Sequence, residues 1–495
     1  MTGRWSYKHQ IEANMEAELV GKELLEKRNV NVLLVNVIDE ENSIVRPPLG
    51  LGYLASYLRK HGGPYNIKYT DRNIEETVRT FKPRVVCMSC VSVNYDRAKA
   101  IAKKIKEINS KTIILIGGFH ISLEPQSLDP NIDLGILGEG EEIFYKIVES
   151  LFANNFFITE EIRKIQGVAF WENEKVNINS GRGFVKDLDT IPPPDRELLG
   201  DHLYSTITTS RGCVYKCVYC TTPNMWGNRI RFHSAEYVVN EIEHLYKRYG
   251  AKVIYLQDDL FTVNFPRLRK IVELLKEKGL NKKVYFTFLG RSNNISEEFL
   301  DIIKDLKVDC INIGFETANQ EVLTATKGAG HSEGFHHITV DDHINAIKLL
   351  NKHKIRFAGY FMIGFPMDTK ETIMQTYNFI KKYKVRGITF KVTPFPGTPL
   401  WEYAAEKGLV KGEDFSYSQL QHGMKLVDQN EICLSEHLTL KELNELYAKF
   451  RKLEKKIAKK HILKDFLYDP KWAFNYYFMT VLKSKLFYEN KKKVL

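Results

Sequence analysis

The chain has 495 residues, of which 43% are hydrophobic and 27% charged, and its formal net charge at pH 7 is +11. This length suggests two to four domains, and the composition is that of a soluble globular protein. No run of 18 apolar residues occurs and the charged first 30 residues lack the apolar core of a signal peptide, so we expect neither a spanning helix nor secretion. The seven unevenly spread cysteines suit a reducing compartment, and the cytoplasm is the expected location.

The first part of the chain alternates apolar, strand-like runs with helical patterns. The helical patterns include Leu49–Lys60 and Tyr95–Asn109. Such alternation predicts a parallel, doubly wound α/β sheet, whose ligands bind at the carboxyl ends of the strands. The strand-like runs are Val32–Val37, Ile67–Thr70, Val85–Val91, Ile113–Ile116 and Leu134–Leu137.

Polar residues and glycines follow three of these runs, at Ser89–Ser92, Gly117–His120 and Gly138–Glu141. Glycine at a strand end lets the backbone approach a bulky ligand closely, although each of these glycines also suits an ordinary turn. Cys87 and Cys90 have the spacing of half a metal site. They lie on a buried run, however, and strand alternation points them to opposite faces, so we expect core cysteines. Cys310 and Cys433 are expected to be chemically inert.

A connector and a second alternating series follow. The connector contains a predicted hairpin, Val168–Trp171 with Val176–Ile178, and three consecutive prolines, at 192–194, that stiffen a boundary. From Tyr204 onward six strands are predicted: Tyr204–Thr209, Lys252–Gln257, Val284–Leu289, Cys310–Phe315, Arg356–Ile363 and Thr389–Thr393. Helical patterns lie between them, and six β/α units predict a partial barrel with its active site at the carboxyl ends of the strands.

Cys213, Cys217 and Cys220 follow the first of these six strands and an Arg211-Gly212 turn. Three thiolates in the spacing Cys-x3-Cys-x2-Cys leave a [4Fe–4S] cluster one ligand short, so that one iron is open to a small molecule. A structural zinc site is the alternative. It would need a fourth ligand, and the nearest histidines, His202 and His233, do not have finger-like spacing.

With both halves in view, residues 30–400 resemble the cobalamin-binding radical S-adenosylmethionine (SAM) family. The resemblance rests on short motifs in a specific order: Pro47–Leu54, Gly117–His120, Gly138–Glu141, Leu188–Asp195, the cysteine triple with Tyr219 before its last member, Asp258-Asp259, Ile313–Glu316, Gly364–Pro366 and Pro396–Leu400. It implies a cobalamin-binding domain (30–151), the connector (152–202) and a radical SAM partial barrel (203–412). A helical N-terminal extension (1–29) and a basic helical C-terminal region (413–495) lie outside it.

The resemblance also implies site residues. The three cysteines would bind the cluster, whose open iron chelates the amino and carboxylate groups of SAM. The residues implied to contact SAM are Tyr219, Asp258, Asp259, Arg291 and Glu316. Those implied to hold cobalamin are Ser89, Ser92, Gly117, Gly118, His120, Gly138 and Glu139.

One departure concerns the cobalt. Many cobalamin domains carry an Asp-x-His-x-x-Gly motif whose histidine ligates cobalt from below, and this chain has Val37–Asn42 after its first strand instead. We therefore expect cobalamin without a histidine lower ligand. The resemblance implies a SAM-cleaving enzyme, supplied with electrons by a flavodoxin or ferredoxin, that methylates an unactivated carbon. Oxidative cyclisation or rearrangement is the alternative reaction, and a non-catalytic cobalamin sensor is the contrasting class.

Two segments carry further expectations. Residues 441–495 hold 15 Lys or Arg and 6 Asp or Glu among many aromatic residues. This composition suits an anionic membrane surface and an apolar substrate, or a helical extension packed on the protein, and no nucleic-acid reader module is recognisable. The loop Lys327–Asp342 holds three histidines, His331, His336 and His337. They could contact substrate, bind a second metal ion or face solvent.

Overall fold

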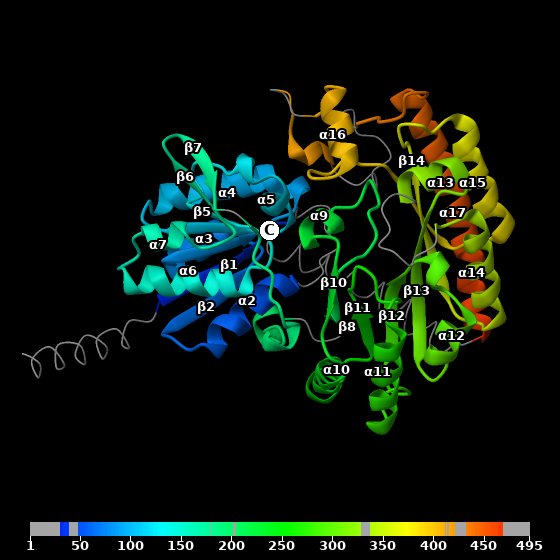
Figure 1. Cartoon of the computed structure of the whole chain (residues 1–495), viewed down its shortest axis with the longest axis horizontal. Coiled ribbons are helices and arrows are strands. Elements are labelled where there is room, and N and C mark those ends of the chain that lie inside the picture. Colours follow the sequence, from blue (N-terminus) through cyan, green and yellow to red (C-terminus); the bar gives the residue numbers. More distant parts are fainter. Residues whose placement is uncertain are drawn as a thin grey trace, which may run out of the picture. The chain divides into compact units, whose positions relative to one another are not determined.

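The computed structural model describes residues 30–38, 48–179, 181–200, 204–327, 337–410, 412, 415–420 and 432–468. The chain divides into two compact units. The first unit comprises Met1–Phe286, Asp305–Lys307 and Pro394–Leu420, and the second comprises Thr287–Lys304, Val308–Thr393 and Gln421–Leu495. Figure 1 shows the elements, coloured along the sequence.

The first unit contains a seven-stranded sheet in the order β2-β1-β3-β4-β5-β6-β7. Its first five strands are parallel, as the alternating pattern predicted. The last two, β6 and β7, form the hairpin predicted in the connector, and β6 pairs antiparallel with β5. The strands are β1 (Val30–Asn36), β2 (Tyr65–Thr70), β3 (Val85–Ser89), β4 (Ile113–Gly117), β5 (Leu134–Ile136), β6 (Val168–Glu172) and β7 (Lys175–Ile178).

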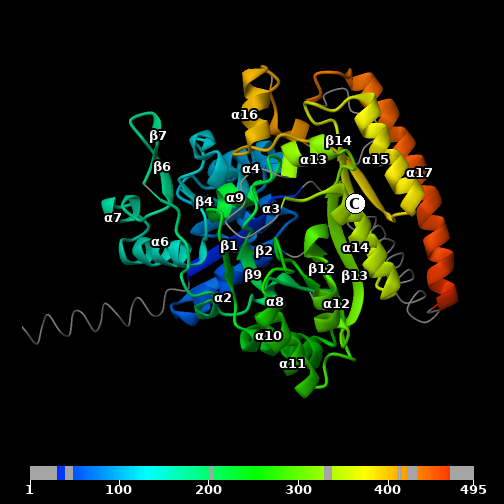
Figure 2. The same ribbon diagram turned by 45° about the vertical axis from the view of Figure 1, so that its right-hand side comes forward.

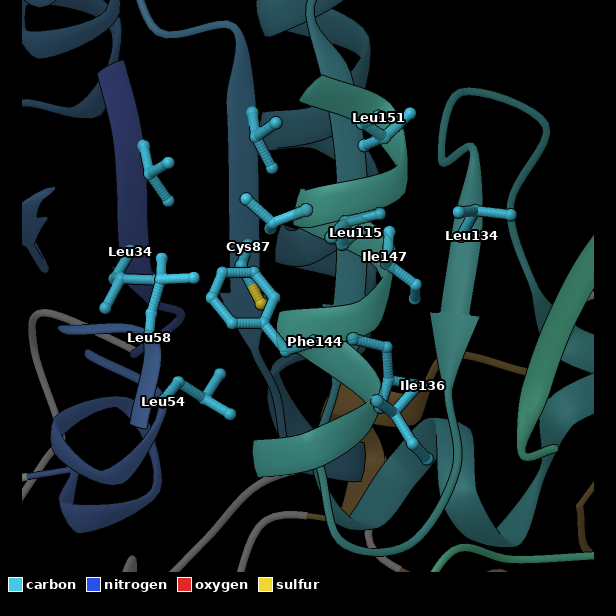
Figure 3. Packing of buried hydrophobic residues seen from close by; sticks show 14 of the residues in the cluster. Leu34, Leu54, Leu58, Cys87, Leu115, Leu134, Ile136, Phe144, Ile147 and Leu151 are labelled. Atoms are coloured by element: carbon cyan, nitrogen blue, oxygen red, sulfur yellow. The ribbon is translucent and has the colours of Figure 1, made fainter. Parts of the chain in front are cut away.

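Helices cover both faces of this sheet because alternate strand residues point to opposite sides. On one face the core contains residues of α2 (Leu49–Lys60) and α6 (Glu141–Ala153). Figure 3 shows Phe144, Ile147 and Leu151 of α6 packed over the strands. On the other face lie α3 (Ile74–Phe81) and α4 (Tyr95–Ile108).

Cys87 in strand β3 and Cys90, the residue after its last member, follow this alternation. Cys87 belongs to the core that contains α6, and Cys90, just past the end of the strand, belongs to the core on the opposite face. Both are buried, with 1% and 3% of their surface exposed. The prediction that they are core residues on opposite faces is confirmed.

The cysteine triple lies between two short strands that the sequence did not indicate. Strand β8 (Tyr204–Ile207) ends early, and β9 (Ser210–Gly212) pairs antiparallel with β10 (Ile230–Phe232). The prediction of an Arg211-Gly212 turn is therefore wrong. Both residues are members of the β9–β10 ladder, and the chain turns back only after the cysteines and helix α9 (Thr222–Trp226).

The β/α alternation from β8 onward is confirmed. In the first unit β8 pairs in parallel with β11 (Val253–Leu256), and in the second unit β13, β14 and β15 pair in parallel. Strand β12 (Tyr285–Gly290) begins in the first unit and ends in the second. The remaining strands are β13 (Lys307–Glu316), β14 (Phe357–Ile363) and β15 (Gly387–Lys391). The connecting helices are α10 (Ala235–Tyr249), α11 (Phe265–Glu277), α12 (Glu297–Ile303), α13 (Gln320–Lys327), α14 (Val340–Lys352) and α15 (Lys370–Tyr383).

Two segments after β15 complete the units. Helix α16 (Pro399–Glu406) and the short 3-10 helix η5 (Tyr417–Leu420) belong to the first unit. Helix α17 (Leu440–Tyr468) belongs to the second, where it runs beside α15, as Figure 2 shows. Within the part of the chain that the structure describes, no helix is long and apolar enough to cross a bilayer.

Candidate active site

Cys213, Cys217 and Cys220 lie on the loop between β9 and α9, each partly buried. Burial raises the pKa of the Cys213 thiol to about 12 and that of Cys220 to about 11, with the neighbouring thiols adding to both shifts. Burial raises the pKa of the core thiol Cys87 in the same way, so the case for a cluster rests on three cysteines within eight residues of one loop, which can supply three of its four ligands. The donor set therefore suits a cluster.

Single-ion coordination is a poorer match. Among the described residues no three His, Cys, Asp or Glu side chains converge as they would around one metal ion. The cysteine ligands of a [4Fe–4S] cluster bind different iron atoms, so their sulfur atoms need not converge on one point. His233, considered as a zinc ligand, is buried and hydrogen-bonds Asp189 at 3.1 Å.

Two adjacent carboxylates at the end of β11 hold both ends of the cysteine loop. Asp258 accepts hydrogen bonds from the backbone N–H and hydroxyl groups of Thr209 and Ser210, at 2.5 to 3.1 Å. Asp259 accepts from the N–H of Gly212 and the hydroxyl of Thr222, both at 3.0 Å. Desolvation raises the pKa of both carboxyl groups, and the hydrogen bonds oppose that shift. Their predicted contact with SAM stays a prediction, and the structure shows them bracing the loop.

Glu139, expected on the cobalamin surface, is the centre of a buried ion network within the first unit. It lies in the turn between β5 and α6, 4% exposed. Arg211 donates to Glu139 at 2.9 Å and to Glu141 at 2.7 Å. Arg231 donates to both oxygens of Glu139, at 2.7 and 2.9 Å. These charge-assisted bonds lower the pKa of Glu139 although burial alone would raise it.

The carboxyl edge of the first sheet gathers most of the other residues assigned to cobalamin. The strand order reverses direction between β1 and β3, the place where ligands of doubly wound sheets bind. Asn36 and Ser89 end these two strands opposite one another. Gly117 ends β4, and Gly118 follows it with a φ of 105°. Gly138, also at a positive φ of 86°, precedes Glu139.

His120 lies on the short helix α5 (Phe119–Leu123) beside this edge and is fully buried. Its Nδ1 is 3.1 Å from the Ser92 hydroxyl and its Nε2 is 3.0 Å from the Ser127 hydroxyl. Its ring packs between Tyr95 and Tyr417, with centroid distances of 3.8 and 4.5 Å. Burial lowers the pKa of His120 to about 3, so the imidazole is neutral at pH 7.

In the second unit, Arg291 and Glu316 each contact Lys327, whose role sequence reasoning missed. Lys327, 4% exposed at the end of α13, has its Nζ 3.2 Å from Glu316 Oε1 and donates to the Gly314 carbonyl. Arg291, directly after β12, donates to the Lys327 carbonyl at 3.1 Å. Glu316 has a φ of 66°, a conformation rare for a residue with a side chain and often found at functional sites.

A second missed residue lies beside this group. His343 of α14 is fully buried and its Nδ1 is 2.7 Å from the hydroxyl of Ser292, the residue after Arg291. Lys327, expected at the start of the loop Lys327–Asp342, is the last residue of α13. Nothing in the sequence indicated the buried contacts of Lys327 or His343. Tyr219 lies within the cysteine loop, half-buried. His331 and His336 of the predicted substrate loop lie outside the described residues.

Comparison with known proteins agrees with this architecture. The Radical SAM superfamily model matches residues 207–380, and the B12 binding domain model matches residues 44–148. An uncharacterized methyltransferase of Pyrococcus horikoshii is 32% identical over 81% of this chain and 86% of its own length. An anaerobic magnesium-protoporphyrin IX monomethyl ester cyclase of Cereibacter sphaeroides is 25% identical over 75% of this chain and 62% of its own length.

Among solved structures, the radical S-adenosylmethionine methyltransferase TsrM from Kitasatospora setae superposes with a TM-score of 0.67 at 17% identity. The superposition covers 86% of this chain and 88% of that one. The likeness supports the fold, a B12-binding α/β domain followed by a parallel radical SAM domain. The protein is therefore an enzyme that belongs to the radical SAM superfamily, in the group whose members carry a B12 binding domain.

Proposed function

We propose that the protein uses a [4Fe–4S] cluster, SAM and cobalamin to methylate an unactivated carbon of an apolar small molecule. One observation carries this proposal: a sheet edge suited to cobalamin and the cysteine loop lie in one compact unit, joined by the bonds of Arg211 to Glu139. When bound, the three cofactors supply a carbon-centred radical and a methyl group. The relatives named as methyltransferases support methylation as the outcome.

The chain's own residues would bind and orient these groups. Cys213, Cys217 and Cys220 would hold three irons and leave the fourth for SAM. Arg291 would pair with the SAM carboxylate, and Glu316 with its amine or ribose hydroxyl groups. We further propose that Asp258 and Asp259 do not contact SAM but hold the loop whose cysteines would bind the cluster. Their oxygens already accept hydrogen bonds from the ends of that loop.

The proposal includes cobalamin without a protein imidazole below the cobalt. His120 is the histidine at the carboxyl edge of the first sheet, and both of its ring nitrogens already face serine hydroxyl groups. Turning the ring toward a cofactor would break both hydrogen bonds and its packing against Tyr95 and Tyr417. Ser89, Gly117 and Gly118 at the same edge remain the proposed contacts for the nucleotide tail.

Radical oxidative cyclisation is the second candidate reaction, favoured by the similarity to the magnesium-protoporphyrin ester cyclase. One anaerobic experiment tests both. Reconstituted protein, reduced by flavodoxin or a chemical donor, should convert SAM to 5′-deoxyadenosine. Substrate found by comparing metabolites of a deletion strain should gain one CH₂ in mass. Absence of 5′-deoxyadenosine would refute the proposed radical cleavage of SAM, and product formed without the added CH₂ would favour cyclisation.

The same preparation tests the cobalt ligand. Bound cob(II)alamin should give an electron paramagnetic resonance (EPR) spectrum without hyperfine splitting from a protein imidazole. Splitting by a histidine nitrogen would contradict the proposed coordination, and failure to retain any corrinoid would contradict the binding site itself.

We also propose that the C-terminal region contacts an anionic membrane, which would help to deliver an apolar substrate. The first half of α17 packs through buried Leu443, Leu446 and Phe450. Its last turns differ, because Leu463 and Leu467 are 66% and 76% exposed beyond a run of exposed lysines. Residues 469–495 lie outside the described part.

Flotation with anionic liposomes tests this proposal. The full chain should float in a salt-sensitive manner, and a Leu463→Ser/Leu467→Ser variant should float less. If this variant and a chain that lacks residues 441–495 both float as well as the wild type, the C-terminal region does not bind the membrane and only packs on the protein.

A further inference from the structure

We propose that Glu139, with Arg211 and Arg231, is a positioning device that fixes the cysteine loop from within the B12-binding domain. The inference rests on the proposed function in one respect, the assignment of the cluster to Cys213, Cys217 and Cys220. It gives a new role to the Gly-Glu-Gly-Glu turn at 138–141, whose Glu139 had been expected to contact cobalamin. All of the groups lie in the first unit.

The two arginines approach the same carboxylate from opposite strands of one hairpin. Arg211 of β9 and Arg231 of β10 are direct partners in the antiparallel ladder. Arg231 binds Glu139 through both terminal nitrogens and also donates to the Val185 carbonyl at 2.5 Å. The backbone N–H of Val185 donates to the same carboxylate. Glu139 therefore ties together the hairpin, the connector and the B12-binding domain.

Because these charged side chains are buried, their free energy depends strongly on how well the charges are paired. The side chains of Glu139, Arg211 and Arg231 are only 1%, 7% and 14% exposed. Charges removed from water are tolerated when each is matched by an opposite charge and hydrogen bonds, and they become strongly unfavourable when one partner is lost. Glu141 accepts a second bond from Arg211, so two carboxylates face two guanidinium groups. The side chains of Glu139, Arg211 and Arg231 can therefore move little without leaving a buried charge unpaired.

The network reaches the cysteines through one residue. Gly212 connects Arg211 to Cys213, with a φ of 100°, and a Cβ atom there would lie 2.0 Å from the Arg229 carbonyl oxygen. Its N–H donates to Asp259 at 3.0 Å. Because Gly212 is held on both sides, the backbone that enters Cys213 follows the position of Arg211. Glu139, which precedes Arg211 by 72 residues, thus determines the position of the first residue of the cysteine loop.

The test compares Glu139→Gln with Glu241→Gln in the full-length protein. Glu241 forms a similarly buried ion pair with Arg196 at 2.6 Å in the same unit, and neither partner lies in the cysteine loop. Both substitutions remove a buried negative charge and keep side-chain shape, so both should lower the unfolding temperature. Arg231→Gln serves as a second probe of the network if Glu139→Gln does not express.

Two readouts separate positioning from stability. In cluster-free protein, alkylation of Cys213, Cys217 and Cys220 followed by mass spectrometry should be about fivefold faster in Glu139→Gln than in Glu241→Gln, equivalent to about 1 kcal/mol of loop opening. Buried Cys87 and Cys90 report general unfolding. After reconstitution, the EPR spectrum of the reduced cluster and its change on adding SAM should be altered only in Glu139→Gln.

Equal alkylation rates in the two variants would overturn the positioning role, whatever cofactors bind. A wild-type protein that assembles no cluster would instead refute the proposed function, and the alkylation comparison would still decide the role of Glu139.

Discussion

Replacing any one of Cys213, Cys217 and Cys220 with alanine is expected to abolish assembly of the [4Fe–4S] cluster. In the proposed site each cysteine would hold a different iron, and a cluster that already has one iron without a protein ligand should not survive the loss of a second such ligand. Anaerobic reconstitution followed by iron and sulfide analysis measures the effect. The wild type should contain four irons and four sulfides per chain, and each variant close to none.

Cys87→Ala and Cys90→Ala are the matched controls. Both thiols are buried in the core of the first sheet, and burial raises the pKa of Cys87 to about 12 and that of Cys90 further. They should leave the iron and sulfide content unchanged, with only a small loss of stability. Full cluster content in a variant that lacks all three loop cysteines would show that the cluster is held elsewhere.

Gly118→Ala is expected to destabilise the B12-binding domain by about 3 kcal/mol or more. Its φ of 105° and ψ of −172° belong to a region that is essentially restricted to glycine. An added Cβ would lie 2.6 Å from the Cys90 carbonyl oxygen, a backbone atom that cannot move without displacing the end of β3. Thermal unfolding followed by circular dichroism measures the loss.

Gly117→Ala provides the comparison, because the nearest atoms to its Cβ would be 3.9 Å away. This variant should unfold within about 0.5 kcal/mol of the wild type. If Gly117 contacts cobalamin as predicted, the added methyl group should weaken corrinoid binding, measured by absorbance titration, without the loss of stability. Unchanged binding in Gly117→Ala would remove Gly117 from the proposed site, and an equally stable Gly118→Ala would contradict the stated backbone constraint.

Much of the fold was accessible from the sequence because it depends on local patterns. Helix α2 spans the predicted residues, Leu49–Lys60, and α4 ends one residue before the predicted Asn109. The strands of both α/β series were predicted to within a few residues, since each is an apolar run bounded by a turn or a helix. The cysteine triple was equally accessible, because its chemistry is contained within eight consecutive residues.

The partners of individual side chains were not accessible in this way. Glu139 meets Arg211 and Arg231 across 72 and 92 residues of sequence, and strands of three residues such as β9 and β10 are too short to show a period. Arg231 lies between two apolar residues, Ile230 and Phe232. This alternation is the one local sequence sign of strand β10, which places Arg231 beside Glu139.

The sequence by itself determined the main strands and helices of the two α/β series and which cofactors their motifs suit, because periodicity and cysteine spacing are properties of consecutive residues. Only the tertiary structure decided what each buried charge binds. A buried carboxylate is stable only when it is paired with hydrogen-bond donors or cations, and the folded chain determines which of these groups lie within reach. Asp258 and Asp259 meet the ends of the cysteine loop, Glu139 meets two arginines, and Glu316 meets Lys327, because folding places those donors beside them.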